Sequence, residues 1–207
     1  GILRDRMIFN MSEADWDSVI RVHLKGHFAP TRHACAYWRE RSKQTGGPVG
    51  GRIICTSSTS GLLGNAGQSN YGAAKAGIGA FAEIVSMEMA RYGVTVNAIA
   101  PAARTRLTEA TFGAITSEGP FDTWAPENIA PIVVFLATDQ AASITGQVFY
   151  TGGGTLQLYQ GWGPVEELQK DQRWTVEELV ERVPRMFGDR PHAYAPPKSL
   201  LRTDVTS

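Results

Sequence analysis

Residues 51–77, GRIICTSSTSGLLGNAGQSNYGAAKAG, carry the pattern that decides the fold. The run RIICTS near its start is short, apolar and rich in β-branched residues, which is typical of a buried strand. A glycine-rich segment follows, and a long helix is predicted over 71–92, where Gly93 ends it. A strand, a turn and a helix in this order predict a βα unit, the building block of a parallel sheet.

The same alternation continues towards the carboxyl terminus. VTVNAIA (94–100), ended by Pro101, and GQVFYT (146–151), closed by glycines, are two further predicted strands. PENIAPIVVFLAT (126–138) lies between them and begins as a helix should, with a proline near its first turn. Because helices separate the strands, the expected sheet is parallel and the fold class is α/β.

Another long helix is predicted before this region, over 13–41. Ser12 followed by Asp15 forms a start that resembles a capping box, and apolar residues then recur at helical spacing. Pro30 would cost about 3 kcal/mol in a regular helix interior. A bend or break of the helix is therefore expected at Pro30.

Three predicted strands are too few for a complete doubly wound sheet. Such a sheet has about six strands in two halves, with a glycine turn for the cofactor phosphates after the first strand. The segment GGPVGG precedes a strand instead of following one, and TGGGT leads into no clear helix. The prediction is therefore the C-terminal half of a doubly wound, Rossmann-type parallel-sheet domain.

Composition excludes several classes of partner. The 207 residues include 20 basic and 20 acidic side chains, so the formal net charge is zero, and no nucleic acid or anionic membrane partner is expected. Cys35 and Cys55 lack the spacing of metal ligands, so neither a metal site nor a disulfide is expected. No window of eighteen apolar residues and no signal peptide is found, which predicts a cytoplasmic protein.

Tyr71 and Lys75 stand four residues apart, and a helix places such positions on one face. A nearby ammonium favours a phenolate and lowers the pKa of a tyrosine, which is the adjustment that a general acid or base requires. Ser57, Ser58 and Ser60 follow the preceding strand and could donate a hydrogen bond to a reacting oxygen. Each motif alone has a simpler interpretation: a surface pair for the first, and a turn or helix cap for the serines.

Taken together, these residues resemble the active-site segment of the short-chain dehydrogenase/reductases. The family's serine precedes its tyrosine by thirteen positions, and this spacing selects Ser58. The similarity continues in GILRDR, WDSVIRVHLKGHF, VTVNAIAP and the closing segment PENIAPIVVFLATDQAASITGQVFYTGGG. It covers the chain from Gly1 to about Gly154.

The resemblance implies an NAD- or NADP-dependent oxidoreductase that interconverts a secondary alcohol and a ketone, both small molecules, by hydride transfer. Tyr71 would be the general acid in reduction and the general base in oxidation. Lys75 would lower the pKa of Tyr71 and bind the nicotinamide ribose, and Ser58 would hold the substrate oxygen. Donors already in place where an alkoxide develops stabilise a transition state more than a ground state.

Further site residues follow from the same resemblance. His23 stands where the family has a catalytic asparagine on a water-linked proton path to the lysine; the alternative is a histidine satisfied by a backbone carbonyl. Pro101 and Arg104 would line the nicotinamide pocket, and Gly1 matches the last glycine of the family's Asn-Asn-Ala-Gly turn. Residues 105–124 occupy the place of the mobile substrate loop.

The motifs VHLKG, GILRDR and IAPAARTRLT are most similar to the hydroxyacyl-CoA dehydrogenase domains of multifunctional enzymes. This similarity favours a 3-hydroxyacyl-CoA or a steroid-like substrate. In the family, the phosphate-binding turn and the residue that selects NAD or NADP precede the position of Gly1. We therefore expect a natural chain that begins upstream. The alternative is a noncatalytic fragment or partner subunit that keeps this half of the fold as an interaction surface.

Two domains are expected: a partial dinucleotide-binding and catalytic domain over 1–155 and a C-terminal extension over 156–207. In the extension, Thr175 and Glu178 predict the capped start of one short helix that ends at Pro184. The resemblance also implies a homodimer or homotetramer formed through the two long helices.

Overall fold

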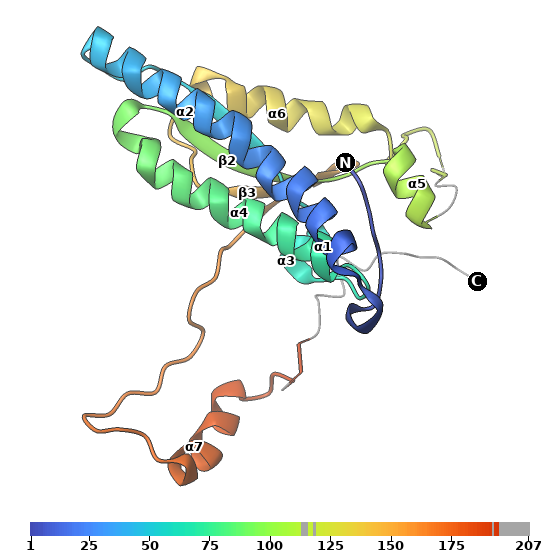
Figure 1. The fold of residues 1–207 in the computed structure, drawn as a ribbon, viewed down its shortest axis with the longest axis vertical. Coiled ribbons are helices and arrows are strands. Elements are labelled where there is room, and N and C mark those ends of the chain that lie inside the picture. Colours follow the sequence, from blue (N-terminus) through green and yellow to red (C-terminus); the bar gives the residue numbers. More distant parts are fainter. Residues whose placement is uncertain (113–115, 118, 192, 195–207) are drawn as a thin grey trace. The chain divides into compact units, whose positions relative to one another are not determined.

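The structure, a computed structural model, describes residues 1–112, 116–117, 119–191 and 193–194. Gly1–Gln160 and Gly161–Ser207 form two separate compact units. The first unit contains the whole sheet and the long helices, whereas the second contains one short helix (Figure 1). The predicted α/β class is confirmed for the first unit.

The sheet has four strands in the order β1-β2-β3-β4. β1 (Arg52–Thr56), β2 (Thr95–Ala102) and β3 (Val148–Gly152) run parallel to one another. β4 (Thr155–Tyr159) pairs with β3 in the antiparallel direction. The three predicted strands are therefore confirmed, although β2 continues through Pro101 instead of ending before it.

β4 is an addition to the three strands expected from the sequence. Gly153 and Gly154 connect it to β3, and Gly153 has a φ of 55°. A Cβ at Gly153 would also lie 3.2 Å from the backbone oxygen of Thr123, so glycine is required here for two reasons. Two glycines between strand-like runs are a known hairpin signal, and this signal could have revealed β4.

The first long helix was expected to bend or break at Pro30, and it does not break there, because the helix continues through that residue. α1 (Glu13–Ile20) begins at the predicted capping box of Ser12 and Asp15, which is present. A π turn over Arg21–Lys25 follows, and α2 (Gly26–Thr45) contains Pro30. A proline ring crowds the carbonyl four residues earlier, which is that of Gly26, directly after the π turn. The irregularity therefore lies one turn before the proline.

The second long helix is α4 (Ser69–Met89), which a 3-10 turn extends to Tyr92. Gly93 then adopts the left-handed conformation, so the predicted end of this helix is confirmed. A short helix, α3 (Thr59–Leu63), which the sequence did not predict, occupies the glycine-rich segment before α4.

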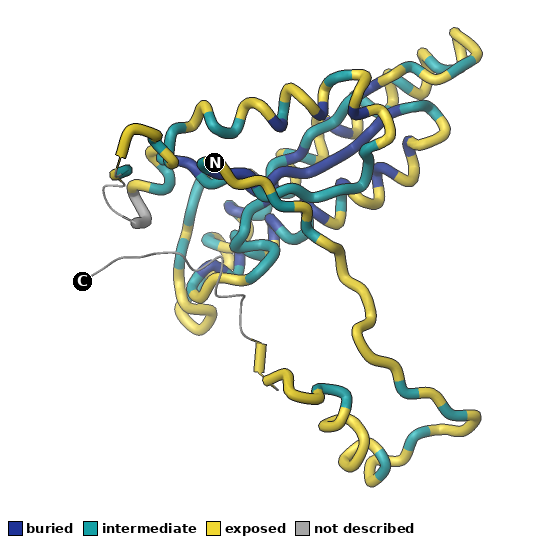
Figure 2. The backbone as a smooth tube through the Cα atoms, turned by 180° about the vertical axis from the view of Figure 1, so that it is seen from behind, coloured by how far each residue is buried: buried dark blue, intermediate teal, exposed yellow. Residues whose placement is uncertain are grey.

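Helices cover both faces of the sheet (Figures 1 and 2). α4 packs on one face through a cluster of buried residues: Cys55, Ile78, Ala82, Val85, Met89, Val94, Val96 and Ala98. α6 (Ala130–Ala137), preceded by a 3-10 turn over Pro126–Ile129, packs on the other face through Ile99, Ile132, Leu136 and Ala141. Burial on both faces explains why β2 reads as a nearly continuous apolar run.

The second unit contains α7 (Val176–Arg182), which begins at the predicted capping box and continues as a 3-10 turn over Val183–Phe187. Trp174 contacts two cations, with Lys170 Nζ 4.7 Å and Arg182 Cζ 5.6 Å from its ring centroid. Among the residues that the structure describes in this unit, none is buried. No helix of the described ranges has the length and apolar character that crossing a membrane requires.

Candidate active site

The carboxyl end of β1 places the serines beside α4. Ser57 extends the pairing with β2, since its amide donates to the backbone oxygen of Ile99 at 2.7 Å. The Ser57 hydroxyl donates to the backbone oxygen of Lys75 at 2.8 Å and so fixes the strand end to α4. Ser58, one residue further, is the N-cap of α3 and accepts a hydrogen bond from the amide of Ser60.

Tyr71 and Lys75 lie one turn apart on α4, as their spacing predicted. Lys75 is only 5% exposed. Its Nζ donates to the backbone oxygen of Thr56 at 2.8 Å and lies 5.5 Å from the centre of the Tyr71 ring. The structure therefore gathers Tyr71, Lys75 and the end of β1 in one place, and a surface pair is excluded.

Burial, more than charge, governs the titration of this pair. Burial lowers the pKa of Lys75 from 10.5 to about 8. The pKa of Tyr71 is raised, first by burial and further by the charge of Asp5, while a side-chain hydrogen bond with Ser58 acts in the opposite direction. The expected lowering of the Tyr71 pKa by Lys75 is thus corrected: at neutral pH the phenol keeps its proton.

Two glycines allow α3 to approach α4 at the site. A Cβ on Gly61 would lie 2.4 Å from the backbone nitrogen of Ala76 and 2.6 Å from the carbonyl carbon of Lys75. A Cβ on Gly72 would lie 3.1 Å from the backbone oxygen of Ser60. Side chains at these positions would push the helix capped by Ser58 away from the helix that carries the tyrosine and lysine.

His23 lies in the π turn and its ring meets Tyr71 edge-on, with 5.0 Å between ring centroids. Its Nε2 lies 2.8 Å from the backbone oxygen of Ile2, which requires a proton on Nε2. The Ile2 amide, 3.3 Å from the same nitrogen, cannot donate to it at the same time, and the shorter contact is the hydrogen bond. Burial is the main cause that lowers the pKa of His23. Gly1 packs against this ring, because a Cβ there would lie 2.9 Å from His23 Cε1.

The amino-terminal segment is attached to the start of α4 by side-chain amides that sequence reasoning missed. Fully buried Asn70 donates to the backbone oxygen of Arg4 at 3.0 Å, and its own oxygen accepts from the amide of Tyr71 at 2.7 Å. Gln68 donates to a carboxylate oxygen of Asp5 at 2.8 Å. These contacts fix the residues directly before Tyr71, although no local pattern marks them in the sequence.

Next to this segment lies a shallow groove of about 820 Å³, lined by the residues from Gly1 to Arg6 and by Leu107. Leu107 belongs to α5 (Arg106–Phe112), which lies within the stretch expected to form the substrate loop. Asp5 contributes a buried carboxylate oxygen that has no hydrogen-bond partner within the described part of the chain. The groove is thus lined on one side by the amino-terminal segment and on the other by a residue of the expected substrate loop.

Pro101 lies near the carboxyl end of β2, and Arg104 lies two residues beyond the end of the strand. Pro101 is paired with Thr151 in the sheet. Arg104 forms an ion pair with Asp122, and its amide donates to the backbone oxygen of Trp124 at 2.7 Å. The two ends of the stretch 105–124 are thus held together.

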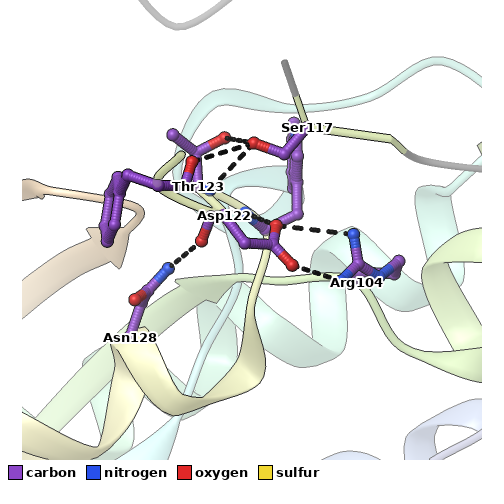
Figure 3. A network of polar contacts seen from close by, with 7 residues as sticks. Arg104, Ser117, Asp122, Thr123 and Asn128 are labelled. Carbon is purple, nitrogen blue, oxygen red and sulfur yellow. Dashed lines mark hydrogen bonds and ion pairs between the residues drawn. The ribbon is translucent and has the colours of Figure 1, made fainter. Parts of the chain in front are cut away.

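Figure 3 shows the network that continues from this pair. Asn128 donates to the backbone oxygen of Asp122 at 2.9 Å, and Ser117 accepts from the amide of Thr123 at 3.1 Å. Through the first contact, the 3-10 turn before α6 supports the residue that pairs with Arg104. The Arg104 guanidinium therefore forms its ion pair with Asp122, at the other end of the same loop.

The arrangement can transfer a proton to or from an oxygen of a bound molecule. A half-buried phenol, a neighbouring serine hydroxyl and an ammonium one helical turn away are the groups that stabilise a developing alkoxide. Within the ranges that the structure describes, no group of three or more His, Cys, Asp or Glu side chains is placed to hold a metal ion.

Known proteins share both the sequence and the fold. A protein-family model described as enoyl-(acyl carrier protein) reductase matches residues 1–155. The hydroxyacyl-CoA dehydrogenase ChsB1 of Mycobacterium tuberculosis is 43% identical over 209 residues, which cover 99% of this chain and 65% of that protein. The 3-oxoacyl-[acyl-carrier-protein] reductase FabG of Rickettsia felis is 38% identical over 76% of this chain and 65% of its own length.

Solved structures are also similar to this chain in fold and in sequence. A short chain dehydrogenase from Mycobacterium avium has a TM-score of 0.81 and 48% identity, covering 95% of this chain and 64% of that one. The full-length peroxisomal multifunctional enzyme type 2 from Drosophila melanogaster has a TM-score of 0.69 and 32% identity, covering 94% of this chain and 34% of that one. The chain spans less than two thirds of the length of each of these relatives. On the match over residues 1–155, the chain belongs to the short-chain dehydrogenase/reductase family.

Proposed function

We propose that this chain is the catalytic part of a nicotinamide-dependent oxidoreductase that interconverts a secondary alcohol and a ketone. One observation carries the proposal. Tyr71 and Lys75 lie on α4, Ser58 caps α3 directly after β1, and the three residues meet beside the carboxyl end of β1. Ligand sites of open parallel sheets lie at this end of the strands.

In the reducing direction, Tyr71 donates its proton to the substrate oxygen, and in the oxidising direction its phenolate takes the proton back. The raised pKa of Tyr71 keeps the phenol protonated at neutral pH, so the site is ready to act as an acid. Ser58 donates a hydrogen bond to the same oxygen and stabilises the alkoxide as it forms. When bound, NAD or NADP supplies or accepts the hydride.

The residues present fit such a cofactor. Lys75 uses one N–H on the backbone oxygen of Thr56, which leaves further donors for ribose hydroxyls. A Cβ on Gly1 would lie 2.9 Å from His23 Cε1, so the His23 ring leaves no room for a side chain there. We assign Gly1 to the cofactor site because its segment resembles the family's Asn-Asn-Ala-Gly turn. We assign the wall of the nicotinamide pocket to Pro101 and Arg104. His23 is proposed to support the protonation of Lys75 from its position against Tyr71.

We favour a 3-hydroxyacyl thioester as the substrate and keep a steroid-like alcohol as the second candidate. Two relatives support the thioester by their names, hydroxyacyl-CoA dehydrogenase and 3-oxoacyl-[acyl-carrier-protein] reductase. Both names describe an acyl chain carried as a thioester. The groove between the amino-terminal segment and Leu107 is the proposed entrance for that chain.

The remaining proposals concern organisation. We assign 1–155 to a partial dinucleotide-binding and catalytic domain and 156–207 to an extension, and we propose a cytoplasmic homodimer or homotetramer. Exposed apolar residues on the long helices support self-association: Phe28 and Tyr37 on α2, and Ile84 and Met87 on α4.

The test uses the natural full-length protein with 3-oxoacyl thioesters, simple ketones and steroid ketones, following nicotinamide absorbance. Tyr71→Phe should lower kcat by about 10²- to 10⁴-fold, the usual contribution of a positioned general acid. Tyr37→Phe is the matched control, because Tyr37 is 60% exposed on α2, and it should leave the rate unchanged. A wild-type rate in Tyr71→Phe would refute Tyr71 as the general acid. An inactive wild type would support the noncatalytic alternative instead.

A further inference from the structure

His27 lies one helical turn after His23, and both of its ring nitrogens contact the backbone. Nδ1 lies 2.7 Å from the carbonyl oxygen of His23, and Nε2 lies 3.1 Å from the amide nitrogen of Thr56. A carbonyl oxygen can only accept, and a backbone amide can only donate. The two contacts together require a neutral imidazole with its proton on Nδ1.

The contact with Thr56 reaches the lysine of the site. The Thr56 amide donates to His27 Nε2, and the Thr56 carbonyl oxygen accepts a hydrogen bond from Lys75 Nζ at 2.8 Å. The next residue, Ser57, is bonded to Ile99 on one side and to the backbone of Lys75 on the other. The position of the last residue of β1 therefore helps to determine where the ammonium lies.

The contact with His23 reaches the other side of the site. His23 belongs to the π turn, where the helix departs from its regular hydrogen-bond ladder. His27 supplies a side-chain donor to the carbonyl of this turn. The ring of His23 is held against Tyr71 by the same turn, so its orientation depends on the backbone that His27 holds.

We propose that His27 is a positioning residue, which locks the π turn to the end of β1 and thereby sets the places of Lys75 and of the His23 ring beside Tyr71. Its catalytic consequence rests on the proposed function. The role is indirect, because both ring nitrogens are occupied by backbone groups and neither is left for a substrate.

The charges around His27 agree with a neutral ring. Burial lowers the pKa of His27, and the positive charge of Lys75 from α4 acts in the same direction. The hydrogen bond to the His23 carbonyl opposes both, since it is stronger from a charged ring. On the side of β1, the contacting residue is Thr56, which carries no charge. Protonation of Nε2 would leave the Thr56 amide without its acceptor.

The experiment compares three variants of the natural full-length protein. His27→Leu removes both hydrogen bonds, and His27→Gln restores a side-chain oxygen that can accept from Thr56. His33→Leu is the control, because His33 is exposed on the same helix. Two readouts are used: steady-state kinetics with the best ketone substrate, and hydrogen exchange of the Thr56 amide, which needs no activity.

We expect His27→Leu to lower kcat by about 10- to 100-fold with KM changed little, the effect of a misplaced catalytic group. The Thr56 amide should exchange about tenfold faster, the equivalent of one lost hydrogen bond. His27→Gln should recover most of both losses, and His33→Leu should cause neither.

Each failure has its own signature. An inactive wild type refutes the proposed function, and the exchange of Thr56 then decides alone whether His27 holds this strand end. Exchange of Thr56 that is the same in His27→Leu and His33→Leu overturns the positioning role. Faster exchange with an unchanged kcat in an active enzyme overturns the catalytic consequence.

Discussion

Replacing Gly61 by alanine tests the close approach of α3 and α4. The new Cβ would lie 2.4 Å from the backbone nitrogen of Ala76, whereas ordinary contacts begin near 3.4 Å, so the helices must separate by about 1 Å. Both nearest obstacles are backbone atoms and cannot rotate away. Overpacking of this kind costs up to about 3 kcal/mol, and the helix propensity of alanine returns about 1 kcal/mol. The expected net loss of stability is about 2 kcal/mol.

The same displacement separates Ser58 from Tyr71, so kcat should fall by about 100-fold. Urea unfolding and steady-state kinetics of the full-length protein measure the two effects. Gly79→Ala is the matched control on α4, because its Cβ would meet nothing nearer than Val148 at 3.9 Å. This control should gain about 0.5–1 kcal/mol in stability. If Gly61→Ala behaves like Gly79→Ala, the argument from close approach is refuted.

Two further predictions concern pH. Arg104 holds the pKa of Asp122 below its usual value, so the pair stabilises the loop above the unfolded pKa and is lost as pH falls through the folded one. Asp122→Asn should remove this acid dependence and expose 105–124 to protease at neutral pH; unchanged cleavage contradicts this. Burial lowers the pKa of Lys75 from 10.5 to about 8, so the unfolded chain binds more protons between these values and stability rises with pH there. Lys75→Met should lack that rise, up to about 3 kcal/mol, in urea unfolding; an equal rise in both proteins contradicts the burial argument.

Much of the fold follows from local patterns. β2 is mostly apolar because helices cover both of its faces, and the helix that contains α4 ends where Gly93 adopts the left-handed conformation. Such signals depend on neighbouring residues only. α3 escaped prediction because five residues are too few to show a helical period. β4 escaped because Leu156 and Leu158 alternate with polar residues, so the segment lacks the continuous apolar run that marked the other strands.

The candidate site likewise has features that the sequence predicts and features that it does not. The spacing of Tyr71 and Lys75 on one helix, and the serine at the strand end, can be read from the sequence. The direction of the Tyr71 pKa cannot, because it depends on how much solvent the folded chain removes. The backbone contacts of His27 and Asn70 join segments far apart in the chain, and no short pattern records them. The expectation of a break at Pro30 failed because the irregular turn, the π turn over Arg21–Lys25, lies one turn before the proline.

The antiparallel hairpin of β3 and β4 extends beyond the last residue that the family model matches. Similarity to the family model stops at residue 155, whereas β4 continues its pairing with β3 as far as Tyr159. A polypeptide trimmed at the end of the matched region would strip β3 of its neighbour and offer open amide and carbonyl groups to other molecules. The residues that the family model matches and the residues that complete the sheet are therefore different sets, and shortened versions of this protein should retain β4 as far as Tyr159.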